Sequence, residues 1–170
     1  IQVYLSFMKM KLVFIQTGGT IDKDYPNKTK GWAFEFGEPA TNRILKKLNP
    51  SFEYTVITAF QKDSLEITDQ DRNELVGLIN SENSSKFIIT HGTDTMIETA
   101  KYLSKHLSNI CVVITGAMLP ERFSNSDAPI NLGCAIATAH LFEKGIFISM
   151  NGIVKVFTDI KRNIETGQFY

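Results

Sequence analysis

The stretch KLVFIQTGGTI, residues 11–21, is an apolar run that stops abruptly at a polar turn containing two glycines. A short continuous apolar run bounded by turn residues is typical of a strand buried on both faces, so residues 11–16 are predicted to form a central strand. Thr17 then lies at the carboxyl end of that strand. The glycines allow positive φ and close approach to a ligand, so hydroxyls and amides of the turn can face one point. The turn is either a binding site or a loop that needs glycine for its geometry, and other stretches must decide.

The strand-to-turn pattern recurs along the chain. Runs rich in β-branched residues predict further strands over residues 54–60, 86–90, 110–115 and 145–150, with another extended piece at 152–157. Helical spacing and a capping box at Thr68 and Asp71 predict helices between them, over residues 39–48, after 68, after 95 and over 128–142. Strands that alternate with helices indicate an α/β fold of one domain. We expect three layers, with helices on both faces of a mostly parallel, twisted sheet of the flavodoxin or Rossmann kind.

Composition narrows the class of partner. The 170 residues suffice for one domain with a core that needs no disulfide, and the two cysteines read as small buried hydrophobes. Eighteen basic and eighteen acidic residues balance, which disfavours nucleic acid or a membrane surface as partner. The three histidines are scattered and predict no metal site. A small-molecule partner is favoured.

The start of the chain resembles a signal peptide only superficially. Lys9 and Lys11 interrupt its apolar run, and residues 12–15 are needed for the first strand. We therefore expect a cytoplasmic protein. The domain is expected to span residues 8–170, with residues 1–7 as a possible leader, and no run approaches the ~20 apolar residues of a membrane span.

Polar residues follow several of the predicted strands. Thr17, Ser64, Thr93 and Asp94 all come just after strand ends, where parallel α/β sheets bind their ligands. No phosphate-binding glycine motif and no GxSxG is present at these turns. A threonine hydroxyl can attack an acyl carbon if a neighbour takes its proton and donors hold the oxyanion. Lys161 is one candidate for that neighbour, although alone it reads as a surface lysine.

Two further segments allow both a functional and a structural interpretation. Trp32, Phe34 and Phe36 alternate and predict a short ribbon beside the glycine turn. This ribbon is either a lid or a hairpin that packs its aromatics on the core or on a second subunit. Tyr25 is the member nearest the turn. Glu66 reads as a carboxylate favoured by the start of the next helix.

The chain resembles the bacterial-type L-asparaginases in two specific motifs. Residues 17–21, TGGTI, are similar to the family's first active-site signature, and residues 91–95, HGTDT, are similar to its second. Residues 116–120, GAMLP, and the pair Asn131–Leu132 resemble further family segments. Lys161 falls where the family has its catalytic lysine, and the resemblance runs from Lys11 to the carboxyl end.

This resemblance implies a mechanism and a set of site residues. Thr17 would be the nucleophile on the side-chain amide of asparagine, giving a β-aspartyl enzyme and ammonia before water releases aspartate. A second catalytic group, made of Thr93, Asp94 and Lys161, would activate the hydroxyl and the water. Tyr25 would polarise Thr17 from the lid. The substrate would be bound by Asp94 and by Ser64, Asp63, Gly92, Ala117 and, as a spare carboxylate, Glu66. The family implies no cofactor and no metal, and its members are homo-oligomers.

The resemblance has departures and competitors. Tyr25 follows Thr17 more closely than expected, and Leu65 replaces a residue that is polar in some members. The family's smaller carboxyl-terminal domain is expected to be absent, which suits a naturally short member better than a fragment. One alternative is the ammonia-supplying subunit of a tRNA-dependent amidotransferase. Another is a non-catalytic protein that binds asparagine or aspartate.

Overall fold

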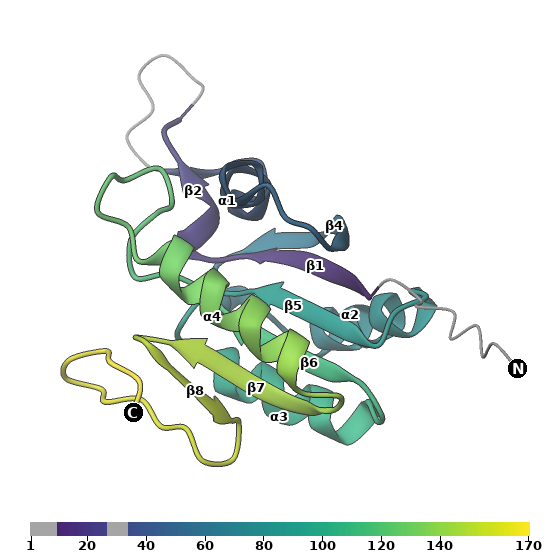
Figure 1. Ribbon diagram of the computed structural model, residues 1–170. Helices are drawn as coiled ribbons and strands as arrows, with labels where there is room; N and C mark the ends of the chain where they lie inside the picture. The colour runs from purple at the N-terminus through teal and green to yellow at the C-terminus, as the bar shows by residue number, and fades with distance from the viewer. Residues whose placement is uncertain (1–9, 27–33) are drawn as a thin grey trace, which may run out of the picture.

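A computed structural model describes residues 10–26 and 34–170. Its centre is one six-stranded sheet in the order β4-β1-β5-β6-β7-β8 (Figure 1). Five of the strands run parallel, and β8 is antiparallel to β7. The strands are β1 (Lys11–Gly18), β4 (Glu53–Lys62), β5 (Lys86–Thr90), β6 (Cys111–Thr115), β7 (Gly145–Met150) and β8 (Ile153–Val156).

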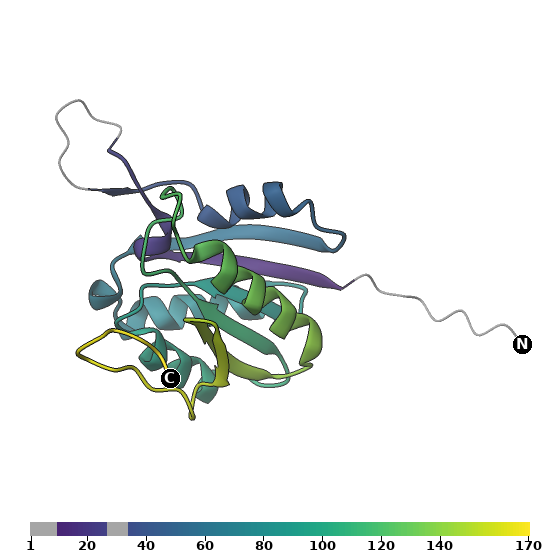
Figure 2. The same cartoon turned by 60° about the vertical axis from the view of Figure 1, so that its left-hand side comes forward.

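Helices cover both faces of this sheet, as Figures 1 and 2 show. They are α1 (Ala40–Leu48), α2 (Asp69–Ser81), α3 (Met96–His106) and α4 (Ala128–Leu141). Helices α1 and α4 belong to one core cluster, and α2 and α3 belong to the other. The predicted α/β class, with three layers and a mostly parallel sheet, is therefore confirmed.

The alternation of side chains along β1 builds both cores at once. Val13 and Ile15 point to the α2–α3 side, whereas Leu12 and Phe14 point to the α1–α4 side. Each of these side chains is at most 1% exposed. Burying one such side chain fully is worth about 1.5–3 kcal/mol, so β1 anchors the two layers.

The order of the strands reverses beside β1. The chain passes from β1 through α1 to β4 on one side, and then through α2 to β5 on the other side of β1. Such a reversal opens a crevice outside the carboxyl ends of the two central strands, where ligands of this architecture bind. The turns after β1 and β5 therefore meet at the position that the topology favours for a site.

Smaller elements frame this edge of the sheet. Short 3-10 helices, η1 (Thr20–Asp22) and η2 (Ser64–Glu66), follow β1 and β4. Strands β2 (Lys23–Asp24) and β3 (Glu35–Phe36) pair antiparallel, as the alternating aromatics predicted. Trp32 lies outside the described residues. At the carboxyl end, residues 157–170 fold back so that Ile160 and Phe169 join the α2–α3 core.

Within the described residues, no helix has the length and apolar character that a membrane crossing requires.

Candidate active site

The turn after β1 is held by contacts that only glycine permits. Gly18 and Gly19 have φ of +106° and +83°, a region that L side chains rarely adopt. A Cβ on Gly18 would overlap the Lys62 backbone, and a Cβ on Gly19 would overlap the backbone of Gly92. The amide of Gly19 also donates to the Lys62 carbonyl at 3.1 Å. The two glycines thus bring the end of β1 against both the end of β4 and the turn after β5.

The turn after β5 begins with a buried histidine whose tautomer follows from its partners. His91 Nδ1 lies 2.7 Å from the Gly92 carbonyl, which can only accept, so Nδ1 carries the proton. Nε2 then accepts from the Thr99 hydroxyl at 2.8 Å, and that hydroxyl accepts from Arg72 Nε at 3.1 Å. Burial lowers the pKa of His91 to about 4, opposed by its bond to Gly92 and reinforced by the Arg72 charge. His91 is therefore a neutral, fixed support of this turn.

The turn after β4 is bonded directly to the turn after β5. Ser64 is buried, and its hydroxyl accepts from the Asp94 amide at 3.3 Å. Thr95 Oγ1 donates to the Ser64 carbonyl at 2.7 Å. A Cβ on Gly92 would overlap the Ser64 side chain, so glycine is again required for this approach. The structure therefore brings together the turns after β1, β4 and β5, which are well separated in the sequence.

The two threonines of the predicted chemistry stand in different environments. Thr17 is fully buried, and its hydroxyl donates to the Thr90 carbonyl at 2.7 Å. Thr93 is partly exposed, and its hydroxyl has no hydrogen-bond partner among the described residues. In this structure the Thr17 hydroxyl is engaged by a backbone acceptor, whereas the Thr93 hydroxyl is available to a ligand.

Arg162, and not Lys161, contacts Asp94 in this structure. Arg162 Nη1 pairs with Asp94 Oδ1, and its Nε donates to the Gly167 carbonyl at 3.1 Å. Its guanidinium also lies over the ring of Phe169, 5.5 Å from the centroid. Lys161 is exposed, and within residues 34–170 its ammonium makes no ion pair or hydrogen bond. The expectation that Lys161 lies beside Asp94 is not met, because successive side chains of an extended segment point to opposite sides.

The remaining predicted residues lie around these turns. Tyr25 is 64% exposed and contacts the ring of Phe34, with 5.4 Å between centroids. No hydrogen bond joins Tyr25 to Thr17 among the residues that the structure describes. Ala117 is 1% exposed and lies in the turn after β6. The last residue of β6, Thr115, accepts from the His91 amide through its carbonyl, so this turn lies beside the turn after β5. The lid assignment of Tyr25 thus has no contact that supports it in this state.

Asp63 and Glu66 form a capping box around η2. The Glu66 carboxylate accepts from the Asp63 amide at 3.4 Å, and Asp63 pairs with Lys23 at 3.2 Å. Both carboxylates are largely exposed. Their local partners account for them without a ligand, although Glu66 is engaged at η2 and not at the start of α2, where it was expected.

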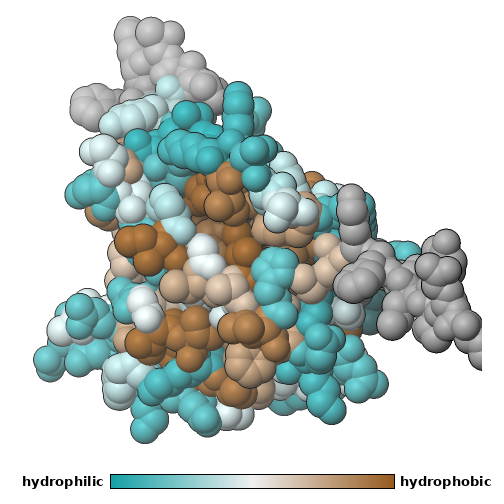
Figure 3. Space-filling view, viewed as in Figure 1, coloured by the Kyte–Doolittle hydropathy of each residue, from teal (hydrophilic) through white to brown (hydrophobic). Residues whose placement is uncertain are grey.

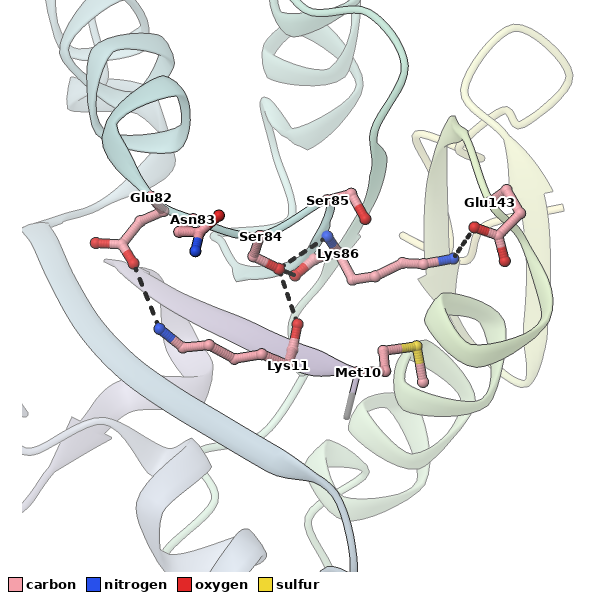
Figure 4. Close-up of a pocket in the computed structure, with 8 residues that line it drawn as sticks. All are labelled: Met10, Lys11, Glu82, Asn83, Ser84, Ser85, Lys86 and Glu143. Atoms are coloured by element: carbon pink, nitrogen blue, oxygen red, sulfur yellow. Dashed lines mark hydrogen bonds and ion pairs between the residues drawn. The ribbon is translucent and has the colours of Figure 1, made fainter. Parts of the chain in front are cut away.

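A separate hollow lies at the opposite edge of the sheet. It measures about 570 Å³ at the amino ends of β1 and β5 (Figure 4). Its two lysines are already paired, Lys11 with Glu82 at 3.8 Å and Lys86 with Glu143 at 3.3 Å. The turns after β1, β4 and β5 do not line it, so the candidate site is chosen by the chemistry at the strand ends and not by volume. No cluster of three or more potential metal ligands occurs among the described residues.

Comparisons with known proteins agree with the two signature turns. The family model "Asparaginase, N-terminal" matches residues 11–164. A glutaminase-asparaginase of Acinetobacter glutaminasificans is 30% identical over 95% of this chain and 53% of its own. L-asparaginase 2 of Escherichia coli K12 is 30% identical over 91% of this chain and 47% of its own. The solved thermostable L-asparaginase of Thermococcus kodakarensis superposes with a TM-score of 0.78 at 29% identity, covering 90% of this chain and 48% of that one. The chain thus spans about half the length of these relatives.

Proposed function

This chain belongs to the asparaginase family, whose amino-terminal domain model spans residues 11–164, and from that membership we propose that it hydrolyses the side-chain amide of L-asparagine. The products would be L-aspartate and ammonia. We propose residues 8–170 as the catalytic unit, working without a cofactor or a metal.

One observation carries this proposal. The turns that hold Thr17 and Thr93 meet glycine to glycine, Gly19 against Gly92, at the point where the strand order reverses. Two hydroxyls, a carboxylate and several amides therefore converge on one edge of the sheet. This set of groups suits acyl transfer through a hydroxyl nucleophile.

In the first half-reaction, the Thr17 oxygen attacks the amide carbon of the substrate. Until this step the bond to the Thr90 carbonyl orients the Thr17 hydroxyl, and during it the Thr17 proton passes toward the leaving nitrogen. The C–N bond breaks, ammonia departs, and a β-aspartyl ester remains on Thr17. The amide of Thr93 would help to hold the oxyanion, and the Ala117 carbonyl would face the leaving amide.

In the second half-reaction, water attacks the ester and restores the Thr17 hydroxyl. Thr93 and Asp94 would activate this water. We propose that Arg162 supplies the fixed positive charge beside Asp94, because a guanidinium can orient a carboxylate but cannot take its proton. Lys161 could act as a proton acceptor only if its side chain turned toward Asp94.

Substrate contacts follow the same turns. Asp94 would bind the α-ammonium, and the Ser64 hydroxyl would bind the α-carboxylate beside Asp63 and Gly92. Tyr25 would have to approach from the β2–β3 ribbon when substrate binds, as a lid that excludes water.

Release of ammonia from asparagine by the purified chain tests this proposal, with glutamine as the control substrate. Hydrolysis of asparagine supports it. Binding of asparagine or aspartate without turnover would identify a binding protein instead. Activity that appears only with an added acceptor enzyme would indicate an amidotransferase subunit.

We also propose a homo-oligomer, supported by the composition of α4. Helix α4 contains no Asp, Glu, Lys or Arg, and yet Ile130 and Leu141 are 65% and 78% exposed. Figure 3 shows apolar residues gathered along this helix and beside it. A helix that is apolar all round is ordinarily buried, so a second copy is the proposed cover. Light scattering that shows only monomer at micromolar concentration would contradict this assembly.

The two cysteines form no disulfide, which suits a reducing compartment, and we propose the cytoplasm as the location.

Glu66→Gln is expected to leave the Michaelis constant for asparagine unchanged within a factor of two. The Glu66 carboxylate accepts from the Asp63 amide, and Gln can still accept that bond, so the change removes a negative charge beside η2 and not a substrate contact. The expected cost is a few tenths to about 1 kcal/mol of stability. Steady-state kinetics and thermal unfolding measure the two effects. A sharply raised Michaelis constant with an unchanged melting temperature would instead make Glu66 a substrate ligand.

A further inference from the structure

Asp22 is a fully buried carboxylate to which the proposed mechanism gives no role. It follows the glycine turn directly and is 0% exposed. One oxygen accepts from the Ala40 amide at 2.7 Å, and the other accepts from the Thr90 hydroxyl at 3.2 Å. Pro39, the N-cap residue of α1, offers no side-chain hydrogen bond, so Asp22 caps this helix from another segment. The carboxylate therefore joins the first turn of α1 to the last residue of β5.

The same residue of β5 also holds the proposed nucleophile. The Thr90 hydroxyl contacts Asp22, and the Thr90 carbonyl accepts from Thr17 Oγ1 at 2.7 Å. The amide of Asp22 donates to the Gly19 carbonyl at 3.2 Å, within the turn itself. Two successive contacts through Thr90 thus connect the Asp22 carboxylate to the Thr17 hydroxyl.

Few charges offset the burial of this carboxylate. Burial raises the pKa of Asp22 from 3.8 to about 6, although bonds from Ala40, Gln16 and Thr90 lower it. The charge of Arg43 on α1 also lowers it, but Arg43 is itself paired with Glu121 of the loop before α4. The side chains of β1 and β5 that bond to Asp22 are those of Gln16 and Thr90, which carry no charge. His91, which follows β5, is neutral above a pH of about 4.

We propose that Asp22 is a positioning residue for Thr17, whose negative charge fixes the Thr90 end of β5 and through it the Thr17 hydroxyl. The ionised carboxylate accepts from both Ala40 and Thr90. A protonated carboxyl carries a hydrogen on one oxygen, so one of these two donors must lose its acceptor or rearrange. The end of β5, and with it the acceptor that orients Thr17, is then less well held. The kinetic part of this inference rests on the proposed function, whereas the structural coupling does not.

The raised pKa of Asp22 makes the free energy of unfolding depend on pH, in the direction expected when a buried charge is kept for function. Between pH 3.8 and about 6 the folded protein binds a proton that the unfolded chain has lost. The resulting stability is complete below pH 3.8 and is lost as the pH rises through about 6. At neutral pH the ionised Asp22 is therefore kept at a cost in stability, as is common for groups at functional sites.

A pH titration followed by NMR tests the coupling without reference to activity. The backbone amides of Thr17 and Thr90 are expected to shift between pH 4 and 8 with a midpoint near 6. Asp22→Asn should abolish this titration. Asp71→Asn is the matched control, because Asp71 is also a buried helix-capping aspartate but is bonded to Lys62 and Thr68. That variant should keep the titration.

The pH dependence of kcat tests the positioning role, because a purely structural role of Asp22 would leave it unchanged. The wild-type kcat is expected to rise through pH 6, whereas Asp22→Asn should show a kcat lowered about tenfold without this limb. The Michaelis constant should stay within a factor of two. Wild-type amides that do not titrate near pH 6 would overturn the proposal, and that measurement requires no variant to fold. A wild-type kcat in Asp22→Asn would overturn it as well. Titrating amides in a chain that cannot hydrolyse asparagine would support the coupling and reject the proposed activity.

Discussion

Replacing Thr17 with alanine is expected to abolish asparagine hydrolysis, with a loss of about 10³-fold or more in kcat. The hydroxyl oxygen is the atom that would form the ester, and no other group can take its place at the end of β1. The fold should survive, because one hydrogen bond of 2.7 Å to the Thr90 carbonyl is lost. Such a bond contributes about 0.5–1.5 kcal/mol to stability. Ammonia release and thermal unfolding measure the two effects.

Thr138→Ala is the matched control for this variant. Its hydroxyl also donates to a backbone carbonyl, that of Cys134 at 2.8 Å, but it does so within α4. A comparable stability loss with unchanged turnover is expected. Mass spectrometry of acid-quenched wild type with asparagine should place the ester on Thr17. Normal ammonia release by Thr17→Ala, or an ester on Thr93, would reject Thr17 as the nucleophile.

Arg162→Ala is expected to lower kcat/KM by about 10- to 100-fold. Its guanidinium pairs with Asp94, and a hydrogen bond to a charged group is worth roughly 1.5–3 kcal/mol, which corresponds to that range. Arg162→Lys keeps the charge and should retain more activity than Arg162→Ala. The measurement is steady-state hydrolysis of asparagine at saturating and at low substrate.

Lys161→Ala is the control one residue away, expected to change turnover by less than twofold because the lysine is exposed. The family resemblance predicts the opposite, a loss of ~10²- to 10⁴-fold for a positioned acid or base. A large loss in Lys161→Ala with a small one in Arg162→Ala would restore the lysine to that role. It would require the Lys161 side chain to reach Asp94 once substrate binds.

The sequence predicted best the features that depend on neighbouring residues in the chain or on the topology of the sheet. The capping box of Thr68 and Asp71, and the limits of β5 at Lys86 and Thr90, were predicted correctly. Apolar runs and capping residues act locally, so short windows of sequence contain them. The meeting of the turns after β1 and β5 also followed from topology, since parallel strands end at the same edge.

The parts that sequence did not predict depend on side-chain direction. Lys161 and Arg162 are adjacent basic residues, and only the path of the extended backbone decides which of them meets Asp94. Thr17 lies at the end of its strand as predicted, but the sequence did not predict that its hydroxyl is buried against Thr90. The burial of Asp22 was not predicted either, because Asp22 begins the polar stretch that follows the glycine turn.

The central place of β1 has a consequence for how the protein is made. β1 can pair with β4 early, but its other edge pairs with β5, which begins at Lys86, about 70 residues after β1 ends at Gly18. At ~5–20 residues per second, the ribosome needs roughly 3–14 s to add those residues. During that interval the nascent chain presents an apolar, unpaired strand edge, which is a template for wrong pairing. Newly made chains are therefore expected to depend on chaperones until β5 has been synthesised, and chains truncated before Lys86 should aggregate.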